Sequence, residues 1–211
     1  MAGNCIFDDE AVSDASRREI VRRYYQAMCN LRTGRGEESA VAKIELLMNK
    51  AEITVDINPT VAASLRKAEE TGMPAVAIEL PDGQVITGKT SSLLGASSAA
   101  LLNALKVLAG LDDSLHLIAP EVIEPIQHLK VSHLGNHNPR LHTDETLIAL
   151  SISAATDPNA ERAMEHLAEL SGCDAHSTVI LSQVDTDVFR KLGVNMSCEP
   201  RYQTKKLYHK R

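Results

Sequence analysis

The sequence has no tryptophan and only two phenylalanines and four tyrosines among its 211 residues. Proteins that bind single-stranded nucleic acid use aromatic rings to stack bases and a basic groove to follow the backbone. The formal net charge is −6, and basic residues are concentrated only at the C-terminal end, from residue 201 onward. We therefore expect no nucleic-acid partner, and we interpret that end as a solvated tail rather than a phosphate-binding arm.

Cysteine and long apolar runs are also scarce. The four cysteines are scattered and form no C-x-x-C pair, which argues against a disulfide framework and against a four-cysteine zinc site. No apolar run approaches the ~18 residues that a membrane-spanning helix requires. The first residues have neither the basic nor the apolar segment of a secretory signal. We expect a cytoplasmic protein with no membrane partner.

The first third of the chain has the pattern of helices. Residues 8–72 carry apolar positions at helical spacing. The last helix of this segment has clear boundaries, because Asn58 is a good N-cap, Pro59 suits the first helical position and Gly72 suits the position after the end. We therefore expect a helical segment over residues 1–72.

The pattern changes after Pro74 to strands that alternate with helices. Residues 75–80 and 84–87 are rich in β-formers and flank a Pro-Asp-Gly turn, which predicts a hairpin. Alternating strands and helices predict a layered α/β domain over residues 73–211. The further expected elements are a helix at 92–109, a strand at 115–118, a helix within 147–155, a helix from Asp157 to about residue 170, a strand at 177–181, a helix at 185–191 and a strand at 194–198.

Residues 83–90 match the phosphate-binding pattern G-x-x-x-x-G-K-[ST]. In a true loop of this kind, the residues between the glycines form a compact nest of N–H groups around phosphates. Here they are Gln-Val-Ile-Thr, a β-prone run after a turn, and no apolar run ending in a magnesium-binding Asp follows. The hairpin interpretation is preferred, and support for ATP as a cofactor is weak.

A less specific anion site remains open at the start of the next expected helix. Lys89, Thr90, Ser91 and Ser92 precede a helix rich in small residues, whose N-terminal dipole favours an anion. The alternative is that these residues are ordinary helix caps. A second alternative, a serine nucleophile within residues 95–99, is weakened because the final glycine of G-x-S-x-G is missing.

The most unusual feature is a stretch rich in histidine, amide and carboxylate side chains over residues 128–145. No zinc template fits, since His128 and His133 are five residues apart and would lie on different faces of a helix. If the stretch forms a pocket, Arg140 would pair with an anionic group, and His142 with Asp144 or Glu145 would provide acid–base chemistry. The alternative is that the histidines simply lie on the surface.

Several segments together resemble a bacterial family of unknown function. Residues 1–6, 87–98, 133–145 and 198–209 are similar to the family known as domain of unknown function 1846, also called uncharacterised protein family 0371. The resemblance runs the whole length of the chain. Family members are longer, and this chain resembles their C-terminal part, which implies that an N-terminal region lies outside it. Some members carry an ATP-dependent peptidase label, but we find no peptidase motif here.

The resemblance also implies a three-layer α/β fold with cytidine-deaminase-like topology. A zinc deaminase needs H/C-x-E on one helix and P-C-x-x-C on the next. The first position reads Ala96-Ser97-Ser98, and residues 121–129 contain no cysteine. We therefore expect no zinc site, because a shared fold does not carry the chemistry.

These observations lead to one main functional hypothesis and two alternatives. The main hypothesis is the C-terminal half of an enzyme that binds an anionic small molecule or nucleotide, where residues 89–92 meet residues 133–145. The alternatives are a non-catalytic oligomerisation or regulatory module, and an ATP-dependent peptidase; in each case we expect a homo-oligomer. The expected catalytic residues are His142, Asp144 and Glu145, and the expected anion-binding residues are Lys89, Thr90, Ser91, Ser92, His133, Asn138 and Arg140.

Overall fold

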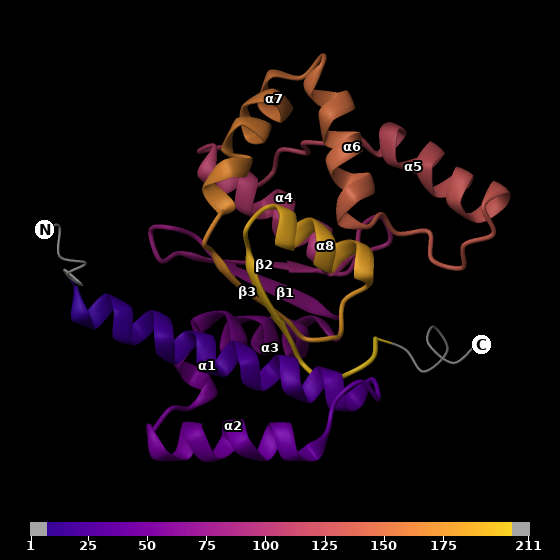
Figure 1. Cartoon of the computed structure of the whole chain (residues 1–211). Helices are drawn as coiled ribbons and strands as arrows, with labels where there is room; N and C mark the ends of the chain where they lie inside the picture. The colour runs from indigo at the N-terminus through magenta and orange to yellow at the C-terminus, as the bar shows by residue number, and fades with distance from the viewer. Residues whose placement is uncertain (1–7, 204–211) are drawn as a thin grey trace, which may run out of the picture.

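A computed structural model describes residues 8–203, and it begins with the expected helices (Figure 1). Asp8 caps the first helix by accepting a hydrogen bond from the Ala11 N–H at 2.9 Å. Asn58 caps the third helix, which ends at Gly72 in a left-handed conformation with φ of 65°. The predicted boundaries of the third helix are confirmed. The elements are α1 (Asp9–Arg32), α2 (Glu38–Lys50), the short 3-10 helix η1 (Val55–Ile57) and α3 (Pro59–Thr71).

A four-stranded sheet follows, in the order β2-β1-β3-β4. Strand β1 is antiparallel to both of its neighbours, whereas β3 and β4 are parallel. The predicted hairpin between β1 and β2 is confirmed, with Gly83 at φ of 84° in its turn. The strands are β1 (Ala75–Glu79), β2 (Val85–Lys89), β3 (Asp174–Ser177) and β4 (Asn195–Cys198).

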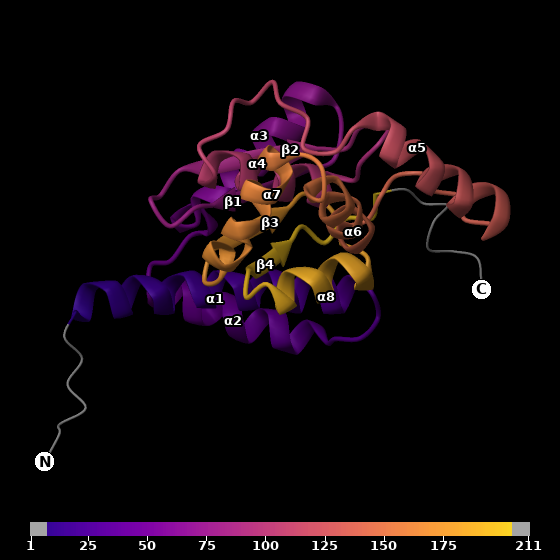
Figure 2. The same cartoon turned by 90° about the horizontal axis from the view of Figure 1, so that it is seen from above.

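Helices cover both faces of this sheet, so the mixed α/β class is confirmed. Figure 1 shows α1 and α3 on one face, with α2 outside α1, and α4 and α8 on the other face. Helices α6 and α7 pack beyond α4, and both views place α5 at the edge of the molecule (Figures 1 and 2). The remaining helices are α4 (Ala96–Leu108), α5 (Pro120–His128), the π-helical turn η2 (Leu129–His133), α6 (Thr143–Ala154), α7 (Pro158–Glu165), the 3-10 helix η3 (His166–Leu170) and α8 (Gln183–Lys191).

The apolar core lies mainly between the sheet and the helices of the α4 side. A smaller core lies between α1, α2 and α3. Burial of these side chains supplies the main driving force for folding. Among the fully buried side chains of the main core are Ile78, Leu101, Leu105, Leu150 and Phe189, and the smaller core includes Val21, Tyr25, Met48 and Val61.

Polar groups attach α1 to the sheet. Arg18 forms ion pairs with Glu79 and Asp174, which lie at neighbouring ends of β1 and β3. The Tyr25 ring lies against the fully buried His176 ring, with centroids 4.6 Å apart. The first helix is therefore held on the sheet by specific contacts as well as by apolar packing.

Three predicted elements differ from the observed ones. The strand expected at residues 177–181 lies earlier in the chain, as β3 at Asp174–Ser177. The helix expected from residue 92 begins only at Ala96, because Ser91 instead makes a turn in which its Oγ accepts hydrogen bonds from the N–H groups of Leu93 and Leu94. The strand expected at residues 115–118 is a loop. Leu117 is buried there, but the segment packs over α4 and pairs with no strand.

The histidine-rich stretch is also more helical than expected. Residues 120–133 form α5 and the π-helical turn η2, in which the Leu134 N–H bonds to the Leu129 carbonyl. A π-helical turn brings residues five apart together. The expectation that His128 and His133 point to different faces is therefore wrong, since their ring centroids are 5.4 Å apart.

None of the helices within residues 8–203 is long and apolar enough to cross a membrane.

Candidate functional site

The backbone brings the two polar stretches of the main hypothesis close to each other. Leu94 and Leu141 form a parallel β-bridge. The Leu141 N–H donates to the Leu93 carbonyl at 3.0 Å, and the Leu141 carbonyl accepts from the Gly95 N–H at 3.2 Å and from the buried Ser98 hydroxyl at 3.0 Å. This bridge therefore holds the two polar stretches, residues 89–92 and 133–145, next to each other.

The first of these stretches makes structural contacts and does not line a pocket with His142. Lys89 is the exposed last residue of β2, and the helix behind it is capped by Gly95, six residues further along. Thr90 is buried and its N–H bonds to the Pro74 carbonyl. Ser91 holds the turn before α4, and the Ser92 carbonyl accepts from the Gln127 side chain.

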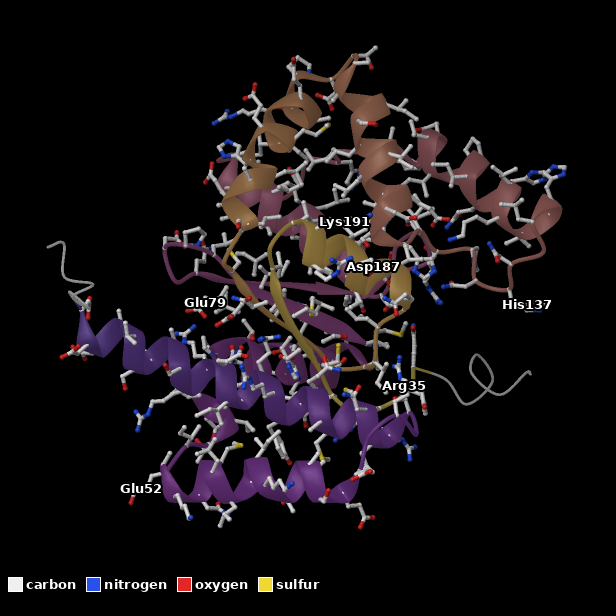
Figure 3. The ribbon with its side chains drawn as sticks, in the orientation of Figure 1. Arg35, Glu52, Glu79, His137, Asp187 and Lys191 are labelled. Carbon is white, nitrogen blue, oxygen red and sulfur yellow. The ribbon has the colours of Figure 1, made fainter. Side chains whose placement is uncertain are left out.

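The second stretch forms one wall of a pocket of about 450 Å³ at the N-terminal end of α6. It brings together all three predicted catalytic residues and one of the predicted anion-binding residues. Figure 3 shows His137 on the loop between α5 and α6, at the outer edge of the molecule. The lining residues are Lys130, Gly135, Asn136, His137, Asn138, His142, Asp144, Glu145 and Val184.

His142, which lines this pocket, is paired with Asp185 from the first turn of α8. The distance between His142 Nδ1 and Asp185 Oδ2 is 3.1 Å. Oδ1 of Asp185 accepts from the N–H and the hydroxyl of Thr143 at 3.0 and 3.1 Å, and Oδ2 accepts from the Ser182 hydroxyl at 2.7 Å. Asp185 is 7% exposed, so its carboxylate is held in one orientation by buried contacts.

The electrostatics of the pair follow from these contacts. The hydrogen bond with Asp185 raises the pKa of His142 above the ordinary value of 6.5 and outweighs the lowering effect of burial. Burial raises the pKa of Asp185, but the hydrogen bonds from His142, Ser182 and Thr143 outweigh burial and leave that pKa lowered. An ionised Asp185 accepts from Nδ1–H, so Nε2 is the ring nitrogen left to meet a ligand.

A second buried ion pair fixes the other side of the pocket. Lys130 is 3% exposed, and its Nζ bonds to Glu145 Oε2 and to the Arg140 carbonyl, both at 2.6 Å. Glu145 Oε2 also accepts from the His142 N–H at 2.8 Å. Because Lys130 lies in the π-helical turn, this turn helps to set the position of the first residues of α6.

The remaining predicted site residues lie around the pocket or outside it. Asn138 lines the pocket, and its Oδ1 accepts from the Arg140 N–H at 3.2 Å. The Arg140 side chain does not line the pocket, since its Nε donates to the Ser91 carbonyl at 2.5 Å. His133 is exposed and packs on the His128 ring. Asp144 lines the pocket, and its Oδ1 accepts from the Glu145 N–H.

Sequence reasoning missed Asp185, Ser182 and Lys130. One local signal was present, because Ser182 and Asp185 have the S-x-x-D spacing that is typical of a helix N-terminus. The Ser182 side chain does cap α8, by accepting from the Asp185 N–H at 3.1 Å. Nothing in the sequence pointed to the contact with His142, which lies 43 residues away along the chain.

We expect the stability of the protein to depend on pH through His142. A folded-state pKa above 6.5 means that His142 contributes stability which is fully present below that value and is lost as the pH rises through the raised pKa. In urea unfolding at about pH 5.5 and about pH 8.5, His142→Gln should therefore cost more free energy at the lower pH. His166→Gln, which breaks an exposed pair with Glu169, is the matched control. An equal cost of His142→Gln at both pH values would contradict this assignment.

No group of three His, Cys, Asp or Glu side chains in the described part of the chain could hold a metal ion.

Comparisons with known proteins identify the family. A model described as "Domain of unknown function DUF1846, C-terminal" matches residues 56–208, and one described as "Domain of unknown function DUF1846, N-terminal" matches residues 1–52. UPF0371 proteins of Streptococcus pyogenes serotype M5 (strain Manfredo) and Streptococcus thermophilus are each 53% identical to the chain over 210 residues. The alignments cover 100% of this chain but only 42% of either relative, so the chain spans less than half of their length.

One expectation from the resemblance needs correction. The chain does not correspond to the C-terminal part of the family alone, because the residues of α1 and α2 match the N-terminal model. The two models together account for residues 1–52 and 56–208, and the chain belongs to the DUF1846 (UPF0371) family of proteins of unknown function.

Proposed function

We propose that this chain contains an acid–base site at which His142 exchanges a proton with a small anionic molecule, of the sugar phosphate or nucleotide class. The observation that carries the proposal is the pairing of Asp185 with His142, which lines the pocket. A buried carboxylate that fixes one nitrogen of a histidine selects the tautomer and leaves the other nitrogen to act as a base. Neutral His142 then takes a proton at Nε2, and the protonated ring returns it.

The preference for an anion is supported by the protonatable ring of His142 and by the helix end at the pocket. The raised pKa of His142 favours the protonated, positively charged ring when an anion approaches. Glu145 is already neutralised by Lys130, so its charge does not repel an anion, whereas Asp144 has no cationic partner among the described ion pairs and is the one lining charge that opposes an anion. The pocket also lies at the N-terminal end of α6, where the helix dipole stabilises negative charge.

The test is a thermal-shift screen of the chain with sugar phosphates, nucleotides and the corresponding neutral sugars. A ligand that binds only the folded state should raise the melting temperature by roughly 5–10 °C at about 100 times its Kd. His142→Gln should remove most of this shift, whereas His166→Gln, a histidine–carboxylate pair on the surface, should keep it. A stabiliser that is turned over by the wild type should not be turned over by His142→Gln.

Two other outcomes of the screen would contradict parts of the proposal. Stabilisation by neutral sugars alone would overturn the anionic class but not the acid–base pair. A shift of equal size in His142→Gln would show that the ligand binds elsewhere.

A second candidate function, a non-catalytic oligomerisation or regulatory module, is favoured by exposed apolar side chains near the same pocket. Ile148 and Ile152 lie four residues apart on α6 and are 59% and 57% exposed, and Leu134 is 64% exposed. Contiguous exposed apolar side chains mark interaction surfaces. No stabiliser in the screen, together with a stable homo-oligomer in light scattering, would favour this function.

Two structural expectations also remain proposals. The cytidine-deaminase-like topology is supported by the β1–β2 hairpin followed by α4 and by the parallel pair β3–β4. An N-terminal region that acts together with this chain is supported by the greater length of the relatives.

A further inference from the structure

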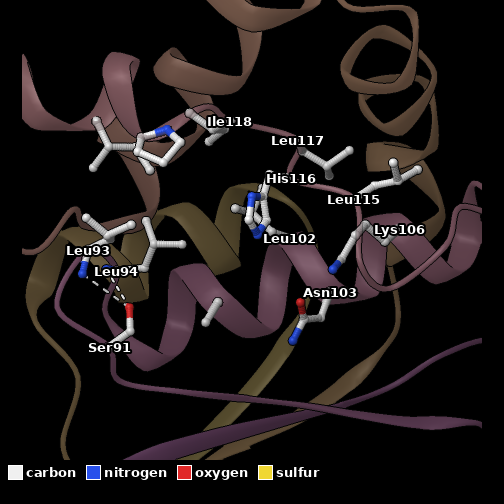
Figure 4. A pocket seen from close by; sticks show the side chains of 13 residues that line it. Ser91, Leu93, Leu94, Leu102, Asn103, Lys106, Leu115, His116, Leu117 and Ile118 are labelled. Carbon is white, nitrogen blue, oxygen red and sulfur yellow. Dashed lines mark hydrogen bonds between the residues drawn. The ribbon is translucent and has the colours of Figure 1, made fainter.

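A second cavity lies beside the Ser91 turn and shares no lining residue with the His142 pocket. It has a volume of about 240 Å³ and lies between α4 and the loop over residues 111–119, with α5 at one end (Figure 4). A cavity of about 150 Å³ holds benzene. By the same scale, this cavity has room for roughly ten non-hydrogen atoms.

The walls of the cavity are mostly apolar. Leucine and isoleucine side chains come from the turn before α4, from α4 itself, from the overlying loop and from α5. Ligand pockets typically combine such a lining with a few polar groups that fix orientation. The apolar lining residues include Leu93, Leu94, Leu102, Leu117, Ile118 and Ile123.

The polar lining groups are cationic or neutral, with Lys106 and Asn103 at one end and Ser91 at the other. Figure 4 shows the Lys106 amine and the Asn103 amide near each other, with His116 next to Leu102. None of the 13 described residues that line the cavity is acidic. The cavity thus pairs an apolar body with a positive end.

Lys106 can accept a new anionic partner at little cost. The residue is only 9% exposed, and its Nζ bonds to the Asp113 carbonyl at 2.7 Å and to the Asp113 carboxylate at 3.0 Å. The Asp113 side chain is 97% exposed, so its carboxylate can turn into water while the backbone bond stays. A ligand carboxylate would take that place next to the ammonium group.

We propose that this cavity binds a small amphipathic carboxylate, such as a medium-chain fatty acid. The apolar chain lies against Leu102 and Leu117, and the carboxylate bonds to Lys106 and to the ring N–H of His116. A neutral alcohol of the same length fills the same space but cannot form the charged hydrogen bond that a carboxylate forms with the Lys106 ammonium group. This site does not depend on the function proposed for His142.

The experiment is isothermal titration of the whole chain with octanoate and, separately, with octanol. Octanoate should bind saturably, and octanol should bind about tenfold or more weakly, because a hydrogen bond to a charged group contributes roughly that factor. Lys106→Met keeps the apolar stem and should abolish the preference for octanoate. Lys191→Met, an exposed lysine on α8 (Figure 3), should keep it.

The remaining outcomes decide against the proposal in different ways. No saturable binding of octanoate by the wild type would overturn the site itself. Equal binding of octanoate and octanol would overturn the role of Lys106. Loss of octanoate binding in His142→Gln, with binding retained in Lys106→Met, would place the acid in the other pocket.

Discussion

Asp185→Ala should destabilise the protein by about 3–5 kcal/mol, because it removes the common acceptor of a buried polar network. The Thr143 N–H and hydroxyl, both on a fully buried residue, lose their partner, and so do Ser182 and His142. A buried donor left without an acceptor costs its full desolvation penalty. Equilibrium unfolding in urea measures the loss as a lower transition midpoint.

Two further variants make this prediction specific. Asp185→Asn keeps an oxygen that can accept from Thr143, so we expect a smaller cost of about 1–2 kcal/mol. Asp187→Ala lies on the same helix but removes only surface contacts, with Gln183 and with Arg190 at 3.3 Å, and it should leave the midpoint nearly unchanged. If Asp185→Ala were as mild as Asp187→Ala, the buried network would not exist as described.

Gly88→Ala should destabilise the protein by more than about 3 kcal/mol, at or above the upper end of the usual range for overpacking. A Cβ at this position of β2 would lie 2.1 Å from the Ala100 backbone nitrogen and 2.5 Å from Ala100 Cα. These atoms belong to the backbone of α4 and cannot move aside as a flexible side chain could. The glycine is therefore required because α4 lies directly on the strand.

The matched control is Gly95→Ala, at the N-cap of the same helix. The added Cβ would meet only the Leu141 carbonyl oxygen at 3.6 Å, and φ is already −67°. We expect a loss of no more than about 1 kcal/mol from the poorer cap. Similar midpoints for Gly88→Ala and Gly95→Ala in urea unfolding would contradict close packing of α4 on β2.

The Gly88 contact also explains why the phosphate-loop pattern is misleading. Residues 83–90 match that pattern, but residues 85–89 form a strand, and the second glycine serves packing between helix and sheet. The β-prone character of Val85 and Ile86 was the local signal that favoured the hairpin. Caps and turns such as Asn58, Gly72 and Gly83 were predictable for the same reason, because their chemistry acts within a few residues.

Features that depend on distant contacts were not predictable. The loop over residues 115–118 has the composition of a strand but lies over α4, away from any sheet edge. The π-helical turn at residues 129–133 forms where Lys130 is drawn inward to Glu145 and the Arg140 carbonyl. Neither partner of Lys130 could be inferred from local spacing.

In the candidate site, too, the contacts between residues far apart in the chain were not predictable. The sequence indicated His142, Asp144 and Glu145 as one polar cluster, and these three line a common pocket. It suggested Asp144 or Glu145 as the acidic partner of His142, whereas the contact to the ring comes from Asp185. Arg140 was expected to bind an anion because of its charge, but its side chain is turned toward the Ser91 carbonyl.

The most direct test of the acid–base site is the nitrogen NMR spectrum of the His142 ring, recorded while a stabilising phosphate from the screen is added. We predict that Nδ1 keeps its proton and continues to donate it to the Asp185 carboxylate. The Nε2 resonance should move in proportion to the fraction of the protein that has bound the phosphate. The same addition to Asp185→Asn should show a lower His142 pKa and a weaker response. An Nε2 resonance that does not move when the compound is saturating would contradict the account.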